Sequence, residues 1–512
     1  MHTLSSPLCL LPVLALTGCL INTDLYNRRR AELLAEGDPT STDGGTPTGT
    51  APIDADSDGH SPPEDCDDSD PTVHPGAEEG WLDDGVDNNC DGVSQEAMTW
   101  TSSEATTMLL GEAAGDELGR RMGWWEEGSC LLVASTFAAE NAGRVYALPA
   151  GSPGTHEAAS LGWFEGPSSY SYLANAVALR SDGVALLAAP AGADGAGAAW
   201  LVDAEAACAG GRADVSEAAL FTIQGTEVGE YLGANAHWLP DLDGDGVQDL
   251  VVISSTAAGG AGEAVFVFSS TLTGDTLTAS DADVVVRGEH DGSGLSAVHA
   301  ATTRSGTHLL FAQAGHASGS HAVARVPIES LRSGSVDDLM DGAIVSYSPD
   351  AAWLEVLGDV NNNGGDDFIG GVWTWSQWEV GDLEGTFEED AATTTFTYDE
   401  DGEWLTGFAS IGDADGDGLG DFVMRAEDWP AQAEQGAMAL VTAADLTPAK
   451  SHDFRARRLH AQGAEAGDSF AYRVLPVGDF DGDGRKDLAV SSYGSDTNGW
   501  SSGAVIFMPL PY

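Results

Sequence analysis

The sequence predicts an all-β fold, a seven-bladed β-propeller preceded by a small disulfide-linked metal-binding module. An acidic loop occurs four times, beginning at residues 241, 359, 413 and 479. A glycine followed by a short apolar strand occurs five times, and no segment after residue 100 keeps a helical period. Units of short antiparallel strands that repeat every ~55–65 residues close radially into a propeller.

The four acidic loops share one pattern of oxygen-bearing side chains. Asp or Asn stands at loop positions 1, 3, 5 and 9, and Gly at position 6. Ca2+ takes about six to eight oxygen ligands, and a tight turn that bends at Gly brings alternate side chains to one point. The predicted ligands are these side chains and the carbonyl at position 7: Asp241, Asp243, Asp245, Val247 and Asp249; Asp359, Asn361, Asn363, Gly365 and Asp367; Asp413, Asp415, Asp417, Leu419 and Asp421; Asp479, Asp481, Asp483, Arg485 and Asp487.

The second loop is expected to hold its ion less tightly than the others, because Asn361 and Asn363 replace two carboxylates. The alternative interpretation of all four loops is that they are acidic surface turns between strands, where Asp and Gly are common without any metal.

The spacing of the loops sets the number of repeats. The loops are 118, 54 and 66 residues apart, and the strand glycines fall at Gly143, Gly197, Gly262, Gly436 and Gly503. Filling the long interval between Gly262 and Gly436 with two degenerate units gives seven repeats from about residue 115 onward. Six repeats remain an alternative. We expect a strand within residues 98–110 to pair with the last blade and close the ring.

These residues resemble FG-GAP repeats, the blades of the integrin α-type propeller. The resemblance rests on the four loops, on Gly229 to Gly233, on Gly467-Asp-Ser-Phe, and on Ala189-Pro190 followed by Gly197. It covers about 400 residues and implies one propeller over 98–512. It also implies structural calcium in the loop between the first two strands of a blade, and no catalytic role for that calcium.

The N-terminus resembles a lipoprotein signal. A short apolar run, residues 8–16, ends in Leu16-Thr17-Gly18-Cys19. It is too short to span a bilayer, although the usual Lys or Arg before it is missing. The resemblance implies a signal peptide over 1–18 and an acylated Cys19, with Leu20 pointing to the outer membrane or cell surface. The alternative is an uncleaved apolar N-terminus. Residues 19–51 would form the anchor and a flexible linker rich in Gly, Pro and Thr.

The charge of the chain limits its partners. Lys and Arg number 20 against 82 Asp and Glu, a net charge of −62. Nucleic acid is excluded because phosphate binding needs basic patches, and the membrane is expected to be contacted only through the lipid. Bound divalent cations would offset part of the self-repulsion. We expect a monomer.

Residues 52–94 form a separate acidic module. Its predicted ligands take positions 1, 3, 5 and 12 of an EF-hand-like loop with Gly at position 6, and His60 is a further candidate: Asp54, Asp56, Asp58 and Asp65. A unit this small needs a metal and a disulfide to fold, and Cys66 and Cys90 can supply the bridge. The module resembles the MopE-type metal-binding motif, whose name implies copper. Its oxygen ligands favour Ca2+.

The remaining candidates are weaker. Cys130 and Cys208 form either a second disulfide or two buried free thiols. The histidines His290, His299, His308, His316 and His321 match no standard metal spacing, and Trp373, Trp375 and Trp378 are more typical of packing between blades than of sugar stacking. No motif of a nucleophilic, zinc-dependent or phosphate-binding enzyme occurs.

The sequence therefore predicts a non-enzymatic, lipid-anchored envelope protein whose calcium-stabilised propeller binds a protein or a glycan. The alternatives are a propeller hydrolase or lyase with its site on the ring axis, and a copper-scavenging surface protein. Turnover abolished by an axial mutation would favour the first, and stoichiometric copper uptake by the module would favour the second.

Overall fold

The computed structural model describes most of the chain from residue 100 onward and part of the acidic module. The described residues are 54–56, 58–77, 87–90, 100–151, 153–256, 262–272, 274–288, 295–303, 306–313, 322–332, 353–371, 378–382, 394–397, 406–414, 416–427, 433–443, 450–453 and 461–510. The chain divides into two compact units, Met1–Pro75 and Gly76–Tyr512. Among the described residues, none of the helices has the length and apolar character needed to span a bilayer.

The described part of the first unit contains turns and bends but no helix or strand. Its turns are held by aspartate side chains that accept hydrogen bonds from backbone N–H groups two residues later, as Asp67 does from Ser69 at 3.3 Å and Asp70 from Thr72 at 3.0 Å. Val73 is the buried apolar side chain of this segment. A core this small gives little hydrophobic stabilisation, which is why the unit depends on other restraints.

The second unit is all-β, and its described residues form seven sheets. The strands of the first three sheets, in chain order within each sheet, are β3 Arg121–Trp125, β4 Cys130–Ser135, β5 Arg144–Pro149, β7 Gly162–Glu165 and β11 Arg212–Asp214; β8 Ala176–Leu179, β9 Val184–Ala189, β10 Ala198–Asp203, β12 Ala219–Gln224 and β16 Thr276–Thr278; β13 Leu232–Leu239, β14 Asp249–Ser254, β15 Glu263–Val267 and β17 Val284–Arg287.

The other four sheets follow the same order of connection. Their strands are β18 Leu295–Thr303, β19 Gly306–Gln313 and β20 Ala322–Pro327; β21 Trp353–Gly358, β22 Asp367–Gly371, β23 Trp378–Asp382, β24 Thr394–Thr397 and β28 Lys450–Asp453; β1 Trp100–Thr101, β25 Gly407–Gly412, β26 Asp421–Ala426, β27 Ala437–Val441 and β29 Ala461–Gln462; β2 Thr107–Leu110, β6 Thr155–Glu157, β30 Phe470–Pro476, β31 Asp487–Ser492 and β32 Ala504–Pro509.

Short helices occur only in the connections of the described residues. The α-helices are α2 Ala138–Asn141, α3 Gly192–Gly195, α4 Ala204–Cys208, α5 Val215–Ala218 and α7 Ile328–Arg332. The 3-10 turns are η1 Ser102–Glu104, η2 Ala158–Ser160, η3 Ser269–Thr271 and η4 Ala279–Asp281.

The predicted seven complete blades need a correction. Six of the seven sheets have at least the four strands of a complete blade among the described residues, whereas the sheet of β18, β19 and β20 has three. The structure therefore has six complete blades and one three-stranded sheet in its described part. The prediction counted blades by dividing sequence intervals, and such spacing does not fix how many strands each unit pairs.

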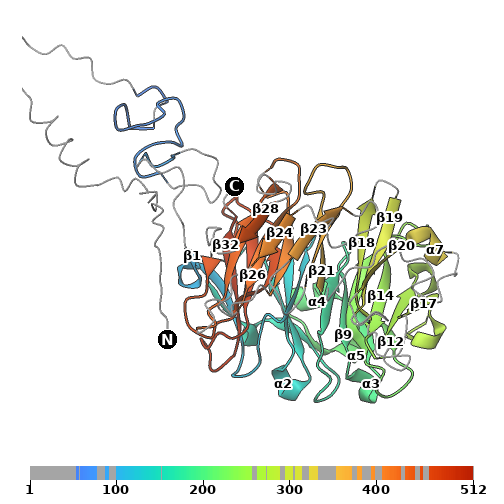
Figure 1. Cartoon of the computed structure of the whole chain (residues 1–512). Helices are drawn as coiled ribbons and strands as arrows, with labels where there is room; N and C mark the ends of the chain where they lie inside the picture. The colour runs from blue at the N-terminus through green and yellow to red at the C-terminus, as the bar shows by residue number, and fades with distance from the viewer. Residues whose placement is uncertain are drawn as a thin grey trace, which may run out of the picture. The chain divides into compact units, whose positions relative to one another are not determined.

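The innermost strands of the sheets form a closed ring. β3, β8, β13, β18, β21, β25 and β30 each contact the next in this order, and β30 contacts β3 again. The predicted closing strand is confirmed, because β2 pairs antiparallel with β32 from Thr107 opposite Phe507 to Leu110 opposite Ala504. β1 lies beside the C-terminal strands in Figure 1 and pairs with β29. The ring is thus fastened by an N-terminal strand in a C-terminal sheet.

The outer edges of several sheets are covered by the neighbouring repeat. β11, β16 and β28 each lie between the third and fourth strands of their own repeat in sequence, yet pair in parallel with the outermost strand of the preceding sheet. β6 pairs with β2 in the same way. Unpaired edges template aggregation, and this fifth strand covers the edge that the fourth strand would otherwise expose.

The core lies between consecutive sheets. The second strands β4, β14, β26 and β31 are buried along their whole length. Each cluster of buried side chains is contributed by two neighbouring sheets, as in the cluster that packs Phe266 of β15 against Phe311 of β19. Strands covered on both faces are continuously apolar, which explains why the sequence shows runs such as Leu-Val-Val-Ile in place of alternation.

The repeated glycine before each third strand has a structural cause. Gly197 has φ of +88°, and a Cβ there would lie 2.1 Å from the carbonyl oxygen of Leu232 in the next repeat. The same close approach to the next repeat occurs at Gly143, Gly262, Gly436 and Gly503. Only glycine combines this backbone angle with so short a distance. The marker used to count repeats is therefore a contact between neighbouring blades.

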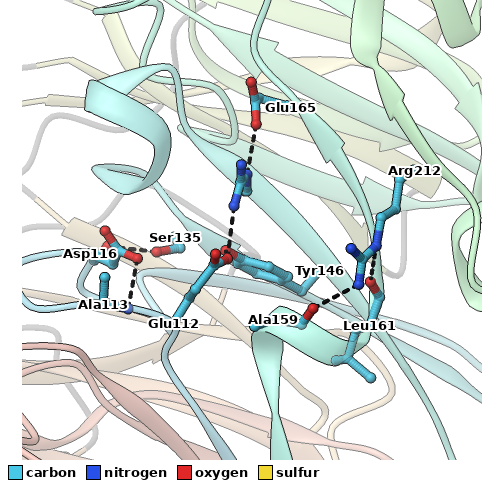
Figure 2. A network of polar contacts seen from close by, with 10 residues as sticks. Glu112, Ala113, Asp116, Ser135, Tyr146, Ala159, Leu161, Glu165 and Arg212 are labelled. Carbon is cyan, nitrogen blue, oxygen red and sulfur yellow. Dashed lines mark hydrogen bonds and ion pairs between the residues drawn. The ribbon is translucent and has the colours of Figure 1, made fainter. Parts of the chain in front are cut away.

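A polar network ties the first blade to the closing segment (Figure 2). Arg144 on β5 donates to Glu112, which follows β2, and to Glu165 on β7, both at 2.7 Å. The hydroxyl of Tyr146 donates to Glu112 at 2.8 Å. Burial and the Glu112 contact raise the pKa of Tyr146. The one guanidinium of Arg144 thus bridges two carboxylates and links the segment after β2 to the first blade.

The open question of Cys130 and Cys208 is decided by the structure, in which they form a disulfide. Cys130 begins β4, and Cys208 ends α4, a helix of the next repeat that contacts β5 and β7. The bond joins the first two repeats. Cys66 and Cys90 are also disulfide-bonded, whereas Cys9, Cys19 and the predicted signal and linker over 1–51 lie outside the described residues.

Candidate metal centres

All four acidic loops occupy the same place in their sheets, between the first and second strands. Residues 241–249 join β13 to β14, and 359–367 join β21 to β22. Residues 413–421 join β25 to β26, and 479–487 join β30 to β31. The repeat of sequence is therefore also a repeat of position.

The ninth residue of each loop is a buried aspartate that begins the second strand. Its carboxylate accepts a hydrogen bond from the backbone N–H of the second loop residue. The donor–acceptor distances are 2.5 Å for Leu242 to Asp249, 3.0 Å for Val360 to Asp367, 2.7 Å for Ala414 to Asp421 and 2.7 Å for Phe480 to Asp487. This bond folds the start of the loop back onto the strand that follows it.

The first residue of each loop holds the bend. Its carboxylate accepts from the N–H of the glycine at position 6, at 2.9 Å for Asp241, 2.8 Å for Asp359, 3.0 Å for Asp413 and 3.1 Å for Asp479. These glycines have φ between +87° and +94°, a backbone conformation that other residues rarely adopt.

The carboxylates converge in two of the loops. Oxygens of Asp241, Asp243 and Asp249 lie within 4.8 Å of one another, and so do oxygens of Asp479, Asp481 and Asp483. Asp245 is turned instead toward Ser269, whose hydroxyl donates to it at 2.8 Å. Ser270 donates to Asp243. These serines follow β15 and were not predicted, because no sequence spacing connects them with the loop.

The second loop differs in its residues, and the third loop is described only in part. In the second loop the side-chain amide of Asn361 donates to Asp367 at 2.7 Å, so part of its polar capacity is used within the loop. Asp415 of the third loop lies outside the described residues. The position-7 residues Val247, Gly365, Leu419 and Arg485 donate their N–H to the side chain at position 5, at 2.7–2.8 Å. Their carbonyls as ligands stay a prediction.

Burial makes the loop carboxylates resist ionisation when no cation is near. It raises the pKa of Asp249, and it raises the pKa of Asp487 to about 6, with repulsion from Asp481 and Asp483 adding to the effect. A divalent cation favours the ionised form and so competes with the proton. The donor set of these loops is oxygen throughout, which suits Ca2+ or another hard cation.

The acidic module carries a further cluster. Oxygens of Asp54, Asp56 and Asp58 lie within 4.8 Å of one another. One buried oxygen each of Asp56, Asp58 and Asp65 has no hydrogen-bond partner. Burial raises the pKa of Asp56, and the charges of Asp58, Asp65 and Asp54 raise it further. Buried carboxylate oxygens without a partner, in and beside a cluster of three carboxylates, are what a cation site looks like without its ion, so this donor set fits Ca2+.

Copper fits the module less well. Cys66 and Cys90 are disulfide-bonded and offer no thiolate. His60 and His74 stack on each other with ring centroids 4.8 Å apart. His60 as a metal ligand stays a prediction. The ligands that copper prefers are thus few among the described residues, whereas oxygens are abundant.

The other predicted candidates do not form a site in the described residues. His299 packs against His237 with centroids 5.4 Å apart, and His308 lies 2.9 Å from the carbonyl of Gly306. Neither joins a group of three metal-ligating side chains. His290, His316, His321, Trp373 and Trp375 lie outside the described residues.

A second candidate surface lies away from the metal loops. The loop between the second and third strands of a sheet is hydrogen-bonded to the connection that enters the next sheet. For example, the N–H of Gly229, before β13, donates to the carbonyl of Gly195, between β9 and β10, at 2.8 Å. The metal loops bond instead to residues that follow third strands, such as Ser269. The two sets of loops therefore lie at opposite ends of the ring. The loops at the end opposite the metal loops carry exposed apolar side chains: Tyr170, Val228, Tyr231 and Trp500.

Comparisons with known proteins agree with these features. Residues 470–508 match the family model described as "FG-GAP repeat", and residues 65–96 match the one described as "Putative metal-binding motif", of MopE type. Neither is a family of enzymes. No curated protein sequence matches the chain.

Two solved structures are similar at low identity. One is described as "Crystal structure of BBS1N in complex with ARL6DN, soaked with lead", with 9% identity and a TM-score of 0.40, covering 81% of this chain and 95% of that chain. The other, "Structure of Dos1 propeller", has 10% identity and a TM-score of 0.44, covering 79% and 94%. Similarities this low carry no argument about function. The matched motifs and the ring of sheets together show that the chain carries an FG-GAP repeat in a β-propeller and a MopE-type metal-binding motif ahead of it.

Proposed function

We propose that this chain is a lipid-anchored, non-enzymatic protein of the cell envelope, in which a calcium-stabilised propeller binds a protein or glycan ligand. The observation that carries the proposal is the separation of the two ends of the ring. One end holds the acidic loops and the other holds exposed aromatic residues. Aromatic side chains in loops on a rigid scaffold are typical of ligand contact, because they offer a large area with few rotamers.

The aromatic end is defined by Tyr170, Tyr231 and Trp500, whose exposed fractions are 62%, 44% and 72%. Tyr170 lies between β7 and β8, Tyr231 precedes β13, and Trp500 lies between β31 and β32. Tyr170 and Tyr172 also contact each other, with ring centroids 6.3 Å apart. Since the large apolar side chains of soluble proteins are mostly buried, this group of exposed rings supports a binding role.

Calcium enters as a structural ion. The loops at the opposite end join first and second strands in four sheets. An ion bound there would hold the loop rigid and neutralise part of the charge of −62.

The test of ligand binding compares three exposed residues. Fluorescently labelled protein is applied to a glycan array and to an array of envelope proteins, as wild type and as the variants Y231A, W500A and L220A. Leu220 is a matched control because it is 55% exposed but lies on the outer strand β12. We expect Y231A and W500A to lose at least about tenfold in retention and L220A to retain it. Equal retention by all variants, or none by the wild type, would contradict the proposal.

The lipid anchor is tested separately. Mass spectrometry of the purified mature chain is expected to find a fatty-acylated N-terminal Cys19. The variant C19S is expected to remain in the soluble fraction after cell breakage, while the wild type sediments with membranes. A soluble wild type would remove the anchor from the proposal and leave the binding role to be judged on the arrays.

A further inference from the structure

The inner side of the ring carries a group of arginines that the metal loops and the aromatic end do not explain. We call Arg121, Arg425, Arg473 and Tyr472 the axial cluster. Arg121 lies on β3 and Arg473 with Tyr472 on β30, two innermost strands in contact. Such a concentration is unusual in a chain that has only 20 basic residues against 82 acidic ones.

Arg425 reaches this cluster from a second strand. It lies on β26 directly opposite Gly407 of the innermost strand β25. A Cβ on Gly407 would fall 2.3 Å from Nη2 of Arg425. The guanidinium therefore crosses the innermost strand over the space that a side chain would fill, and its Nη1 donates to the carbonyl of Tyr472 on β30.

None of the three arginines of the axial cluster forms an ion pair with another described residue. Within the described residues the ion pairs involve other arginines: Arg120, Arg144, Arg180 and Arg287. Arg121 donates to the carbonyls of Asn175 and Arg120, each at 2.9 Å. Arg425 is 6% exposed, and its Nε has no hydrogen-bond partner. A buried guanidinium that lacks a close ion pair is costly, so a ligand that brings a negative charge to these side chains would be favoured.

The nearby carboxylates do not balance the charge. Glu355 on β21 and Glu427 after β26 are the acidic groups that act on Arg425 and Arg473. Burial raises the pKa of Glu355 to about 7, so it is only partly ionised near neutral pH. Among the described residues, three guanidinium groups thus face at most two negative charges, and at least one positive charge is left over.

The pKa of Tyr472 indicates the same excess of positive charge. Burial by itself raises the pKa of its phenol, but Arg473, Arg121 and Arg120 together lower it below the ordinary value. The guanidinium of Arg473 lies 4.6 Å from the centroid of the Tyr472 ring. An environment that favours a phenolate over a phenol also favours other anions.

The cluster is reachable from solvent. Arg121, Tyr472 and Arg473 are half-buried, although burial is the largest influence on their pKa values. Glu355 on β21 and Arg473 on β30 also interact although β25 lies between their strands. The side chains of Arg121, Tyr472 and Arg473 are thus surrounded by protein yet accessible, and Arg473 interacts with Glu355 across an intervening strand. We infer that they face the axis of the ring.

We propose that the axial cluster is an anion-binding site that takes the carboxylate of a singly charged ligand, held by Arg121, Arg425 and Arg473. The planar guanidinium matches a carboxylate with two parallel hydrogen bonds. One negative charge suffices to balance the excess, and a chain of net charge −62 repels ligands of higher charge. Tyr472, which precedes Arg473 on β30 and packs against Tyr493 with ring centroids 4.7 Å apart, offers an aromatic surface beside the guanidinium groups.

Calorimetric titration of the full chain tests the site. The probes are acetate, benzoate and glucuronate, with inorganic phosphate for comparison. The buffer is at pH 8 and contains Ca2+ but no carboxylate. We expect saturable binding of one monocarboxylate per chain. R473Q and R425Q are each expected to weaken it at least about tenfold. R287Q, which breaks an exposed ion pair with Glu263, is expected to leave it unchanged.

E355Q provides a variant with the opposite sign. It removes a competing negative charge and keeps the shape of the side chain, so monocarboxylates are expected to bind several-fold more tightly. This variant and R473Q carry the test if R425Q does not fold, as judged by its melting transition. The proposal fails if no monocarboxylate binds the folded wild type saturably, if phosphate alone binds, or if folded R473Q binds as well as R287Q.

Discussion

The metal interpretation makes a quantitative prediction about two matched aspartates, Asp479 and Asp359. Each stands first in its loop, and each accepts two backbone hydrogen bonds. Asp479 accepts from Gly482 at 2.8 Å and Gly484 at 3.1 Å, and Asp359 accepts from residues 363 and 364 at 3.0 and 2.8 Å. At about 0.5–1.5 kcal/mol for each bond, D479A and D359A should both lose about 1–3 kcal/mol of unfolding free energy in EDTA.

Calcium should separate the two variants. At a Ca2+ concentration about 100-fold above the dissociation constant, one site adds about 2.7 kcal/mol of stability. D479A should lose this increment, because the loop of Asp479 has four carboxylates. D359A should lose less than half as much, because two amides stand in place of carboxylates in its loop and already weaken the binding of Ca2+ there. Urea denaturation with Ca2+ and with EDTA measures both increments. Equal increments in the wild type and both variants would refute the reasoning.

Three further predictions concern the scaffold. E355Q should match the wild type in unfolding free energy near pH 4.5 and exceed it by up to about 3 kcal/mol at pH 8. Burial raises the pKa of Glu355 from 4.5 to about 7, so the wild type has its full relative stability below pH 4.5 and loses it as pH rises through 7. Parallel pH profiles of the two proteins would contradict this. G197A should cost several kcal/mol more than G210A, since both glycines have φ near +90° but only Gly197 lies against another repeat; equal melting temperatures would show that the contact between repeats is unimportant. Replacing both Cys130 and Cys208 by Ser opens a loop of 78 residues and should cost about 4 kcal/mol, and a melting temperature unchanged from the wild type would contradict it.

Features that depend on local spacing could be predicted from the sequence. The acidic loops lie between first and second strands, and each strand glycine directly precedes a third strand, as at Gly143 before β5 and Gly503 before β32. Closure by residues 98–110 was also predictable, because an unpaired strand ahead of the first repeat has one open edge to fill. Asp249 and its equivalents were recognisable because an aspartate stands at position 9 of every loop. In the structure these side chains fold the loop back onto the strand that follows it.

Features that depend on contacts between repeats could not be predicted. The number of complete blades among the described residues is not encoded in the repeat spacing. Cys130 meets Cys208 only because α4 folds back onto the preceding sheet. Arg425 reaches the axial cluster only because the register places it opposite Gly407. The single available signal was the scarcity of basic residues, which makes each buried arginine worth examining.

The most direct test of the central claim is a crystal structure of the full chain grown with Ca2+, with anomalous differences measured at a wavelength where calcium contributes. The account predicts peaks in the loops that begin at Asp241, Asp413 and Asp479, a weaker peak at Asp359, and one among Asp54, Asp56 and Asp58. Each peak should have oxygen ligands at about 2.3–2.6 Å. Acidic loops without peaks, with their carboxylates turned outward to solvent, would contradict it.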